Sequence, residues 1–280
     1  MKRIILYRYH HKFESNKEHL KFIKYLNPSV DIYGLYGGPK EQYAEATVFF
    51  KDLFSHNYLI NGKDDNWKWK HSDMAFQLWY NDFGHTIEFD IMHVLEWDLL
   101  LLDSLENLFS HTNTNTLALT GLMPLSKIEN DWYWVWKDPG RSEWLQLLEY
   151  FKKEFNYNEK PYGMLGPATT LPRIFLEKIK NIEIPILAHD ELRIPMYAQV
   201  FGLNMVDTGF YKKWFSPREW RYFNSNSRDI SIKNIEKQLK KRNGRRAFHP
   251  FRDEISFERF VELYKLIPVS KRSNLWGLFR

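Results

Sequence analysis

Two acidic side chains at the end of an apolar segment have the residue types and spacing best suited to chemistry. Glu96 and Asp98 stand two residues apart, after the apolar stretch 91–95 and before a second apolar run, 99–102. On a strand, residues two apart project to the same side. Both carboxylates would therefore leave a sheet together at its carboxyl end, where open α/β sheets bind ligands. Paired oxygens there suit a hard divalent cation that also holds substrate phosphates, which indicates an enzyme with a phosphorylated donor. The alternative is two solvated charges at a sheet edge.

A second acidic group follows a segment, 184–188, that we expect to be a strand. His189, Asp190 and Glu191 precede a predicted helix, and a carboxylate at this place can take a proton from an attacking hydroxyl group. The alternative is helix capping by Asp190, with Glu191 favourably placed near the positive end of the helix. The residues leave open which of the two acids acts as a base.

Two further stretches offer groups that can bind ligands. His249 precedes Pro250, and a neutral imidazole is a common ligand of transition-type cations; a plain loop position is the alternative. The stretch 163–173, in which we expect a loop at 163–172, carries amides and hydroxyls near a helix start that can hold an acceptor hydroxyl or a phosphate; an ordered connection is the alternative. It lacks the Gly-Lys-Ser/Thr of a P-loop, so we do not expect a nucleoside triphosphatase.

The composition is that of a globular protein with many rings. Hydrophobic residues make up 44% and charged residues 27% of the 280 residues, which is ordinary. Aromatic residues reach 17% and predict a bulky core, with rings that line a groove for sugars or bases as the alternative. The net charge of +5 suits an anionic substrate, a membrane surface or nucleic acid and selects none of them. The absence of cysteine excludes disulfides and thiolate metal sites.

The chain shows no obvious targeting or membrane-spanning segment. The apolar piece after Lys2 and Arg3 is too short for a signal peptide, and no run approaches the roughly 18 apolar residues of a membrane helix. The basic stretch 233–246 predicts a solvated helix face, and the tail 271–280 mixes cations with large apolar groups that can touch a membrane. We therefore expect a cytoplasmic protein, with peripheral contact at the inner face of the membrane as the alternative, and no nucleic acid partner.

The elements that must position these residues alternate between strands and helices. A strand at 4–9, a helix at 17–25 and a strand at 30–36 form a βαβ unit, which predicts a parallel sheet. The fold class is therefore α/β, with a Rossmann-like, mostly parallel twisted sheet flanked by helices, and without a linker we expect one domain. Further helices are expected at 40–54, 72–83, 104–109, 144–155, 173–179, 194–201, 232–242 and 257–264, and further strands at 58–60, 91–95, 117–123 and 184–188.

Taken in order, these pieces resemble a GT-A-type glycosyltransferase over roughly residues 1–255. The segment 93–109 resembles the family's apolar strand, its Asp-x-Asp motif and the short helix that follows. The resemblance implies that Asp98 is a ligand of Mn²⁺ or Mg²⁺ bridging the donor diphosphate, with Glu96 as its partner. Glu96 departs from the family pattern, which has aspartate at this position.

The same resemblance assigns roles to the remaining candidates. The stretch 166–176 resembles the acceptor-side glycine loop and helix start, 189–195 resembles the acidic motif that supplies the base of inverting members, and His249 resembles the late histidine that some members give to the metal. It divides the single GT-A-like domain, 1–280, into a nucleotide-sugar half at about 1–110, an acceptor half at about 111–255, and a C-terminal helix and tail at 256–280. The implied site residues are Asp190 and Glu191 for catalysis, Asp98, Glu96 and His249 for the metal, Tyr9, His10, Asp73 and Trp97 for the donor, and Gly166, Thr169 and Arg173 for the acceptor.

The resemblance implies transfer of a sugar from a nucleotide-diphospho-sugar to an acceptor hydroxyl by metal-dependent, inverting displacement. The acceptor would be a glycan, a lipid-linked molecule or a small molecule, and surface glycan synthesis is one setting for such a reaction. One alternative is a non-catalytic sugar- or nucleotide-binding member of the same fold. The other is a sugar-1-phosphate nucleotidyltransferase, which would need a glycine-rich loop after the first strand, whereas residues 7–12 contain no glycine.

Overall fold

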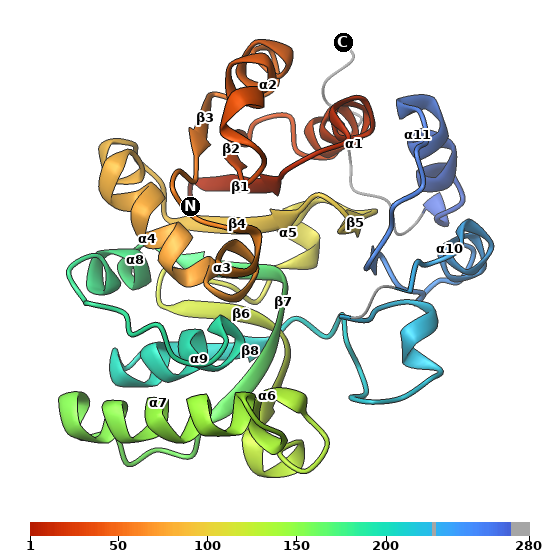
Figure 1. The fold of residues 1–280 in the computed structure, drawn as a ribbon. Helices are drawn as coiled ribbons and strands as arrows, with labels where there is room; N and C mark the ends of the chain where they lie inside the picture. Colours follow the sequence, from red (N-terminus) through yellow and green to blue (C-terminus); the bar gives the residue numbers. More distant parts are fainter. Residues whose placement is uncertain (226–227, 270–280) are drawn as a thin grey trace. The chain divides into compact units, whose positions relative to one another are not determined.

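The main feature of the computed structural model, which describes residues 1–225 and 228–269, is a mixed seven-stranded sheet (Figure 1). The strand order is β3-β2-β1-β4-β7-β6-β8. The pairs β1–β2, β2–β3 and β6–β8 are parallel and β6–β7 is antiparallel. The strands are β1 (Arg3–Tyr9), β2 (Asp31–Tyr36), β3 (His56–Leu59), β4 (Ile91–Glu96), β6 (Thr116–Pro124), β7 (Tyr162–Pro172) and β8 (Asn204–Asp207). The predicted α/β class with a mostly parallel, helix-flanked sheet is confirmed.

Helices and short 3₁₀ turns connect the strands. The helices are α1 (Phe13–Leu26), α2 (Tyr43–Phe49), α3 (Asp65–Lys70), α4 (Ser72–Asp82), α5 (Leu105–Leu108), α6 (Tyr133–Trp136), α7 (Gly140–Phe155), α8 (Arg173–Ile179), α9 (Asp190–Val200), α10 (Ile232–Leu239) and α11 (Phe257–Lys265). The 3₁₀ turns are η1 (Lys40–Gln42), η2 (Gly84–Thr86), η3 (Leu125–Lys127) and η4 (Glu219–Arg221). Over the described ranges, none of the helices has the length and apolarity to cross a membrane. The tail 271–280, for which membrane contact and packing onto the body are the two alternatives, lies outside the described residues.

The chain divides into two compact units, and it passes between them inside β1 and β4. The first unit contains Met1–Arg3, Ile60–His93 and Thr112–Gly209. The second contains Ile4–Leu59 and Val94–His111 and continues from Phe210. The single domain and its halves stay a prediction.

In the first unit, α9 is enclosed over most of its length, and both its apolar and its charged side chains are buried. Leu192, Ile194 and Met196 are all fully buried, and the buried Arg193 is ion-paired with Asp73. On its outer side α9 packs against α7, where the rings of Phe151 and Tyr197 lie 4.7 Å apart (Figure 1). The start of α9, which carries the second acidic group, is therefore held in a rigid setting.

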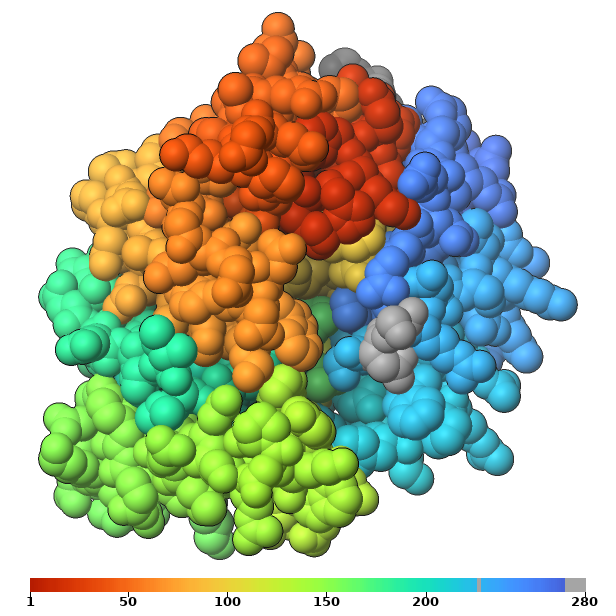
Figure 2. Space-filling model, viewed as in Figure 1, coloured from red at the N-terminus to blue at the C-terminus, as the bar shows by residue number. Residues whose placement is uncertain are grey.

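In the second unit, α1, α10 and α11 form one apolar cluster with a short antiparallel ladder of β5 (Leu100–Leu101) and β9 (Ala247–Phe248). The rings of Phe22 and Phe260 stack at 5.2 Å. At the surface Arg259 Nη2 donates to Glu236 Oε1 at 2.7 Å, and Figure 2 shows the blue segments of α10 and α11 in contact. This cluster fixes the chain that leads into and out of His249.

The expected loop at 163–172 is wrong, because these residues form the long strand β7. Met164, Leu165 and Leu171 are almost completely buried, and β7 pairs with β6 over its length with irregular register. Ala168 adopts a positive φ of 65° within the strand, which is the kind of local distortion found at a β-bulge. Tertiary pairing and burial therefore outweigh the turn preference of the glycines and prolines.

The expected strand at 184–188 is also wrong, because no regular structure forms there. Arg193 Nη1 donates to the carbonyls of Leu187 and Ala188, both at 2.7 Å. These carbonyls bind a side chain in place of a neighbouring strand. The helix that follows begins at Asp190 and not at Ile194 as expected, so both acids of the second group belong to its first turn.

Smaller differences concern element ends and short elements. The helix expected at 40–54 is a 3₁₀ turn followed by α2, which ends at Phe49. The helix expected at 232–242 ends at Leu239. The short elements α3, β5, β8 and β9 were absent from the sequence-based prediction because brief segments carry little periodic signal.

Candidate active site

In the second unit, Asp98 lies directly after β4 in a network of charged groups. The residue is 7% exposed. Its Oδ1 is 3.3 Å from His249 Nε2, and its Oδ2 accepts from Arg252 Nε at 3.1 Å. Burial alone would raise the pKa of Asp98, but the hydrogen bond and charge of His249, together with Arg252, lower it. The carboxylate is therefore held in its ionised form.

The contact of the second ring nitrogen of His249 shows which nitrogen of the imidazole carries a hydrogen. His249 Nδ1 is 2.6 Å from the carbonyl oxygen of Asn224. A carbonyl oxygen only accepts, so Nδ1 carries the hydrogen. In a neutral ring Nε2 then bears a lone pair that faces the Asp98 oxygen. The Nε2 lone pair of His249 and the carboxylate oxygen of Asp98 repel each other unless the imidazole is protonated or a cation lies between them.

This oxygen and nitrogen pair fits a divalent cation of the transition type. The backbone-held Nδ1 of His249 is the support that metal-ligating histidines usually have. Glu96 is engaged elsewhere, because its Oε1 binds Arg8 Nη1 at 2.5 Å. Across residues 1–225 and 228–269 no group of three histidine or carboxylate side chains is arranged to hold a metal. Asp98 and His249 would supply two ligands of such a cation, and substrate phosphates are the usual source of others.

Aromatic rings and cations surround the same turn. The ring of Trp97 lies 4.4 Å from that of His11 and 5.6 Å from that of His10. Lys12 Nζ lies 5.9 Å from the centre of the Trp97 ring. Of the predicted donor-binding residues, Trp97 and His10 therefore meet beside Asp98. Tyr9 lies beneath the surface, 1% exposed, with its hydroxyl donated to Asn57 Oδ1 at 3.0 Å.

In the first unit, Asp190 is held by α4 at the start of α9. Its Oδ2 accepts from the Ser72 amide at 2.8 Å and from the Ser72 hydroxyl. Its Oδ1 lies 2.7 Å from His189 Nδ1. Burial would lower the pKa of His189, but the charges of Asp190 and Glu191 outweigh it and raise the pKa. Asp190 is thus a 2% exposed carboxylate held between Ser72 and His189.

Glu191 has a different environment from its neighbour. Its Oε1 accepts from the Gly166 amide at 2.8 Å, and the residue is 7% exposed. Burial raises the pKa of Glu191 to about 7, the charge of Asp190 acts in the same direction, and His189 opposes both. A carboxyl group with a pKa near neutrality can both take and return a proton under ordinary conditions.

A fully buried ion pair fixes the geometry of this acidic turn. Arg193 and Asp73 are both 0% exposed at their side chains, with Arg193 Nε on Asp73 Oδ2 at 2.7 Å and Nη2 on Oδ1 at 2.6 Å. Because Arg193 also binds the carbonyls just before His189, it holds the loop that leads into α9. Asp73, predicted to bind the donor, lies in this buried pair, and its predicted role is untested.

Indole rings cover His189. The Trp134 ring stacks on the imidazole at 4.5 Å with 28° between the planes, and the Trp69 ring meets it edge-on at 5.3 Å. Trp69 is 58% exposed. An exposed indole beside buried carboxylates offers a flat apolar surface next to groups that bind hydroxyls. The aromatic stretch 131–136 therefore contributes to this cluster as well as to the core.

The predicted acceptor-binding residues fall into two places within the first unit. Gly166 contacts Glu191, and Thr169 donates its hydroxyl to the Gly166 carbonyl at 2.7 Å, so both support the acidic turn. Arg173 donates to the carbonyl of Ile87 at 2.5 Å and forms an ion pair with Glu177. Arg173 is thus tied to the body of the unit, away from these contacts.

Sequence reasoning missed several residues that complete these clusters. Arg252, Asn224 and Trp134 have no motif of their own. The only signal for Arg252 was its place three residues after His249. The contacts of Asn224 and Trp134 join distant parts of the chain, and no local pattern predicts them.

Comparison with known proteins gives structural likeness only. No family model and no curated protein matches the sequence. The apo form of the glycosyltransferase GlyE of Streptococcus pneumoniae TIGR4 is 11% identical, with a TM-score of 0.35, over 74% of this chain and 45% of that chain. The bifunctional glycosyltransferase WbbM is 11% identical, with a TM-score of 0.42, over 95% of this chain and 50% of that chain. The galactosyltransferase LgtC, in complex with donor and acceptor sugar analogues, is 11% identical, with a TM-score of 0.43, over 95% of this chain and 98% of that chain. This chain spans about half the length of the first two, and similarity at this level does not transfer their activities to it.

Proposed function

We propose that this protein is a glycosyltransferase that moves a sugar from a nucleotide-diphospho-sugar to an acceptor hydroxyl. The observation that carries the proposal is the turn after β4, where an ionised Asp98 faces the Nε2 of His249 across 3.3 Å. The rings of Trp97, His10 and His11 lie next to it, and they offer an aromatic surface for the base of a nucleotide. Charged oxygens, an imidazole and flat rings at the carboxyl end of a strand suit a nucleoside diphosphate.

Asp98 and His249 are the residues that would hold Mn²⁺ or Mg²⁺ in this proposal. A bound divalent cation would neutralise charge on the departing nucleoside diphosphate. Arg252, with Nε on Asp98 Oδ2 at 3.1 Å, keeps a guanidinium at the same place. Guanidinium groups bind phosphate oxygens in paired hydrogen bonds, so Arg252 is positioned to hold the diphosphate.

The acidic turn of the first unit supplies the base in this proposal. Glu191 is the better candidate of the two acids, because burial raises its pKa to about 7, whereas Asp190 is engaged by Ser72 and His189. Glu191 would take the proton of the acceptor hydroxyl, which then attacks the anomeric carbon and inverts it. Trp69 and Trp134 offer surfaces on which an acceptor sugar can stack. The cytoplasmic location is likewise a proposal.

One observation favours a second candidate, a non-catalytic sugar- or nucleotide-binding protein. Glu96 and Asp98 are each ion-paired with an arginine of the same unit, at 2.5 Å and 3.1 Å. Both acids are therefore neutralised by the protein itself. A protein of this kind would bind a nucleotide without turning it over.

A hydrolysis and transfer assay with a panel of nucleotide-diphospho-sugars, with Mn²⁺, Mg²⁺ or EDTA, separates the two. We expect slow turnover of at least one donor. The loss should be roughly a hundredfold or more for Glu191→Gln, in line with the usual contribution of general bases, and of similar size for Asp98→Ala, which removes a residue that would hold the cation. Asp65→Ala, at a side chain that is 99% exposed, is the matched control and should keep full activity. Binding without turnover would favour the second candidate, and full activity of Asp98→Ala would overturn the assignment of the site.

A further inference from the structure

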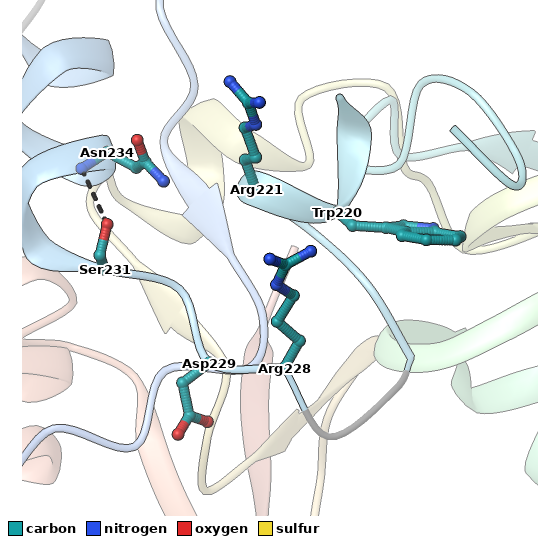
Figure 3. Close-up of a pocket in the computed structure, with 6 residues that line it drawn as sticks. All are labelled: Trp220, Arg221, Arg228, Asp229, Ser231 and Asn234. Atoms are coloured by element: carbon teal, nitrogen blue, oxygen red, sulfur yellow. Dashed lines mark hydrogen bonds between the residues drawn. The ribbon is translucent and has the colours of Figure 1, made fainter. Parts of the chain in front are cut away.

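The second unit contains a pocket that the proposed function does not use. Its volume is about 330 Å³, within the usual range for small-molecule sites. It lies between η4 and α10 (Figure 3). Its lining residues are Trp220, Arg221, Arg228, Asp229, Ser231 and Asn234.

The charges around the pocket favour an anion. Two arginines and one aspartate line it, and the Asp229 carboxylate already accepts from Arg252 Nη1 at 2.8 Å. Figure 3 shows Arg228 extending toward the η4 turn, whereas the Asp229 carboxylate points away from both lining guanidinium groups. The lining arginines therefore outweigh the single acid within the pocket. A guanidinium fork matches phosphate oxygens better than any other side chain does.

A buried amide holds the frame of the pocket. Asn224 is 1% exposed, and its Nδ2 donates to the carbonyls of Trp220 and Arg228, both at 3.0 Å. Its backbone amide donates to the His249 carbonyl at 2.8 Å. The backbone of two lining residues, Trp220 and Arg228, is thus fixed by one buried side chain, which holds this part of the pocket in place without a ligand.

The pocket also shares its supports with the Asp98 cluster. Asn224 accepts from His249 Nδ1 at 2.6 Å, and Asp229 reaches Asp98 through Arg252. The amide of Ile230 donates to the carbonyl of Pro250 at 2.9 Å. Asn224, Asp229 and Arg252 would therefore lie between a ligand in the pocket and the proposed donor site.

We propose that this pocket binds a phosphorylated sugar, and, resting on the proposed function, that this sugar belongs to the acceptor. Arg228 takes the phosphate, and Arg221, whose side chain extends away from Arg228 (Figure 3), adds positive charge at the rim. Trp220 provides a flat ring for the sugar, as aromatic side chains do for ligands with an apolar face and a polar edge. Ser231 and Asn234 provide polar groups for hydroxyls. The acceptor is thus an anionic, phosphate-bearing glycan or sugar, and not a neutral one.

The test uses a hexose 6-phosphate as the probe and titration calorimetry on the full chain. We expect the double variant Arg221→Gln/Arg228→Gln to weaken binding of the probe roughly tenfold or more, since hydrogen bonds to charged groups are among the stronger ones. The double variant Lys213→Gln/Arg218→Gln removes the same charge from exposed positions outside the pocket. It should change binding by no more than about twofold, as surface substitutions usually do. Equal weakening by both double variants, or no binding of the probe, would overturn the proposal.

Competition separates the acceptor from the donor as the source of the phosphate. A nucleoside diphosphate with Mn²⁺ should leave binding of the hexose 6-phosphate intact, because the two ligands occupy neighbouring sites. Displacement of the probe would assign the pocket to the donor and overturn the proposal. Binding of the probe in a protein that binds no nucleoside diphosphate would refute the proposed transferase while supporting the pocket, so the two failures are distinguishable.

Discussion

Replacement of Glu191 by glutamine tests the environment of the proposed base through protein stability. The raised pKa means that folded Glu191 keeps its proton up to about pH 7, whereas in the unfolded chain it loses it near its ordinary value of 4.5. Between these two values unfolding releases a proton, so rising pH favours the unfolded state. Stability from this group is complete below the lower value and lost as pH rises through the higher one.

The magnitude follows from the two pKa values. A rise from 4.5 to about 7, at about 1.4 kcal/mol for each tenfold change in proton affinity, corresponds to about 3 kcal/mol. Glutamine carries no such cost. The free energy of unfolding of the wild type, relative to that of Glu191→Gln, should therefore fall by about 2 to 3 kcal/mol between pH 5 and pH 8.5.

The assay is urea unfolding of both proteins at the two pH values. Glu149→Gln is the matched control, because Glu149 is 73% exposed at its side chain and its variant should differ from the wild type by the same small amount at both pH values. An offset between wild type and Glu191→Gln that is independent of pH would refute the reasoning. It would mean that the pKa of Glu191 is that of an ordinary surface glutamate, so that Glu191 would not be better suited to act as a base than other carboxylates.

Three further predictions concern the supports of the two clusters. Asp73→Asn leaves a buried arginine unpaired and should lower the free energy of unfolding in urea by about 3 to 5 kcal/mol, whereas Asp65→Asn, fully exposed, should leave it nearly unchanged. Asn224→Ala keeps the backbone carbonyl that accepts from His249 Nδ1 but removes the side-chain hydrogen bonds to the carbonyls of Trp220 and Arg228 that hold this carbonyl in place. It should weaken Mn²⁺ binding in the presence of a nucleoside diphosphate, measured by electron paramagnetic resonance, by about tenfold, as for other groups that support metal ligands; unchanged Mn²⁺ affinity would remove the support role. The transfer rate should rise as pH passes through about 7, because the base must lose its proton first, and a rate that falls over this range would exclude Glu191 as the base.

The place of Glu96 and Asp98 at the carboxyl end of β4 could be predicted from the sequence because the signal is local, but the strand ends at Glu96 and the two acids bind different arginines. An apolar run that begins at Ile91 and ends in an acidic turn predicts a buried strand with polar groups at its carboxyl end, and β4 forms as expected. The βαβ pattern of the first 36 residues likewise predicts the parallel pairing of β1 and β2. In both cases the information lies within a few residues.

The site residues and the strand that the sequence did not predict depend on contacts between residues far apart in the sequence. Arg252 meets Asp98 from 154 positions away, and Arg193 meets Asp73 from 120 positions away, so neither contact leaves a trace in local spacing. The same cause explains β7, where pairing with β6 and burial outweigh the turn signals of residues 163–172. The choice between Asp190 and Glu191 likewise depends on burial and on hydrogen bonds from other elements.

The central claim, that Asp98 with His249 forms the core of a nucleoside diphosphate site, is tested most directly by titration calorimetry. Nucleoside diphosphates are titrated with Mn²⁺ into the wild type and into Asp98→Asn, which keeps the shape of the side chain. We expect binding of at least one nucleoside diphosphate to the wild type and a loss of affinity of roughly a hundredfold in the variant, because removing one partner of a buried charged cluster costs several kcal/mol. Equal affinity of the two proteins, or no binding of any nucleoside diphosphate to the wild type, would contradict the account.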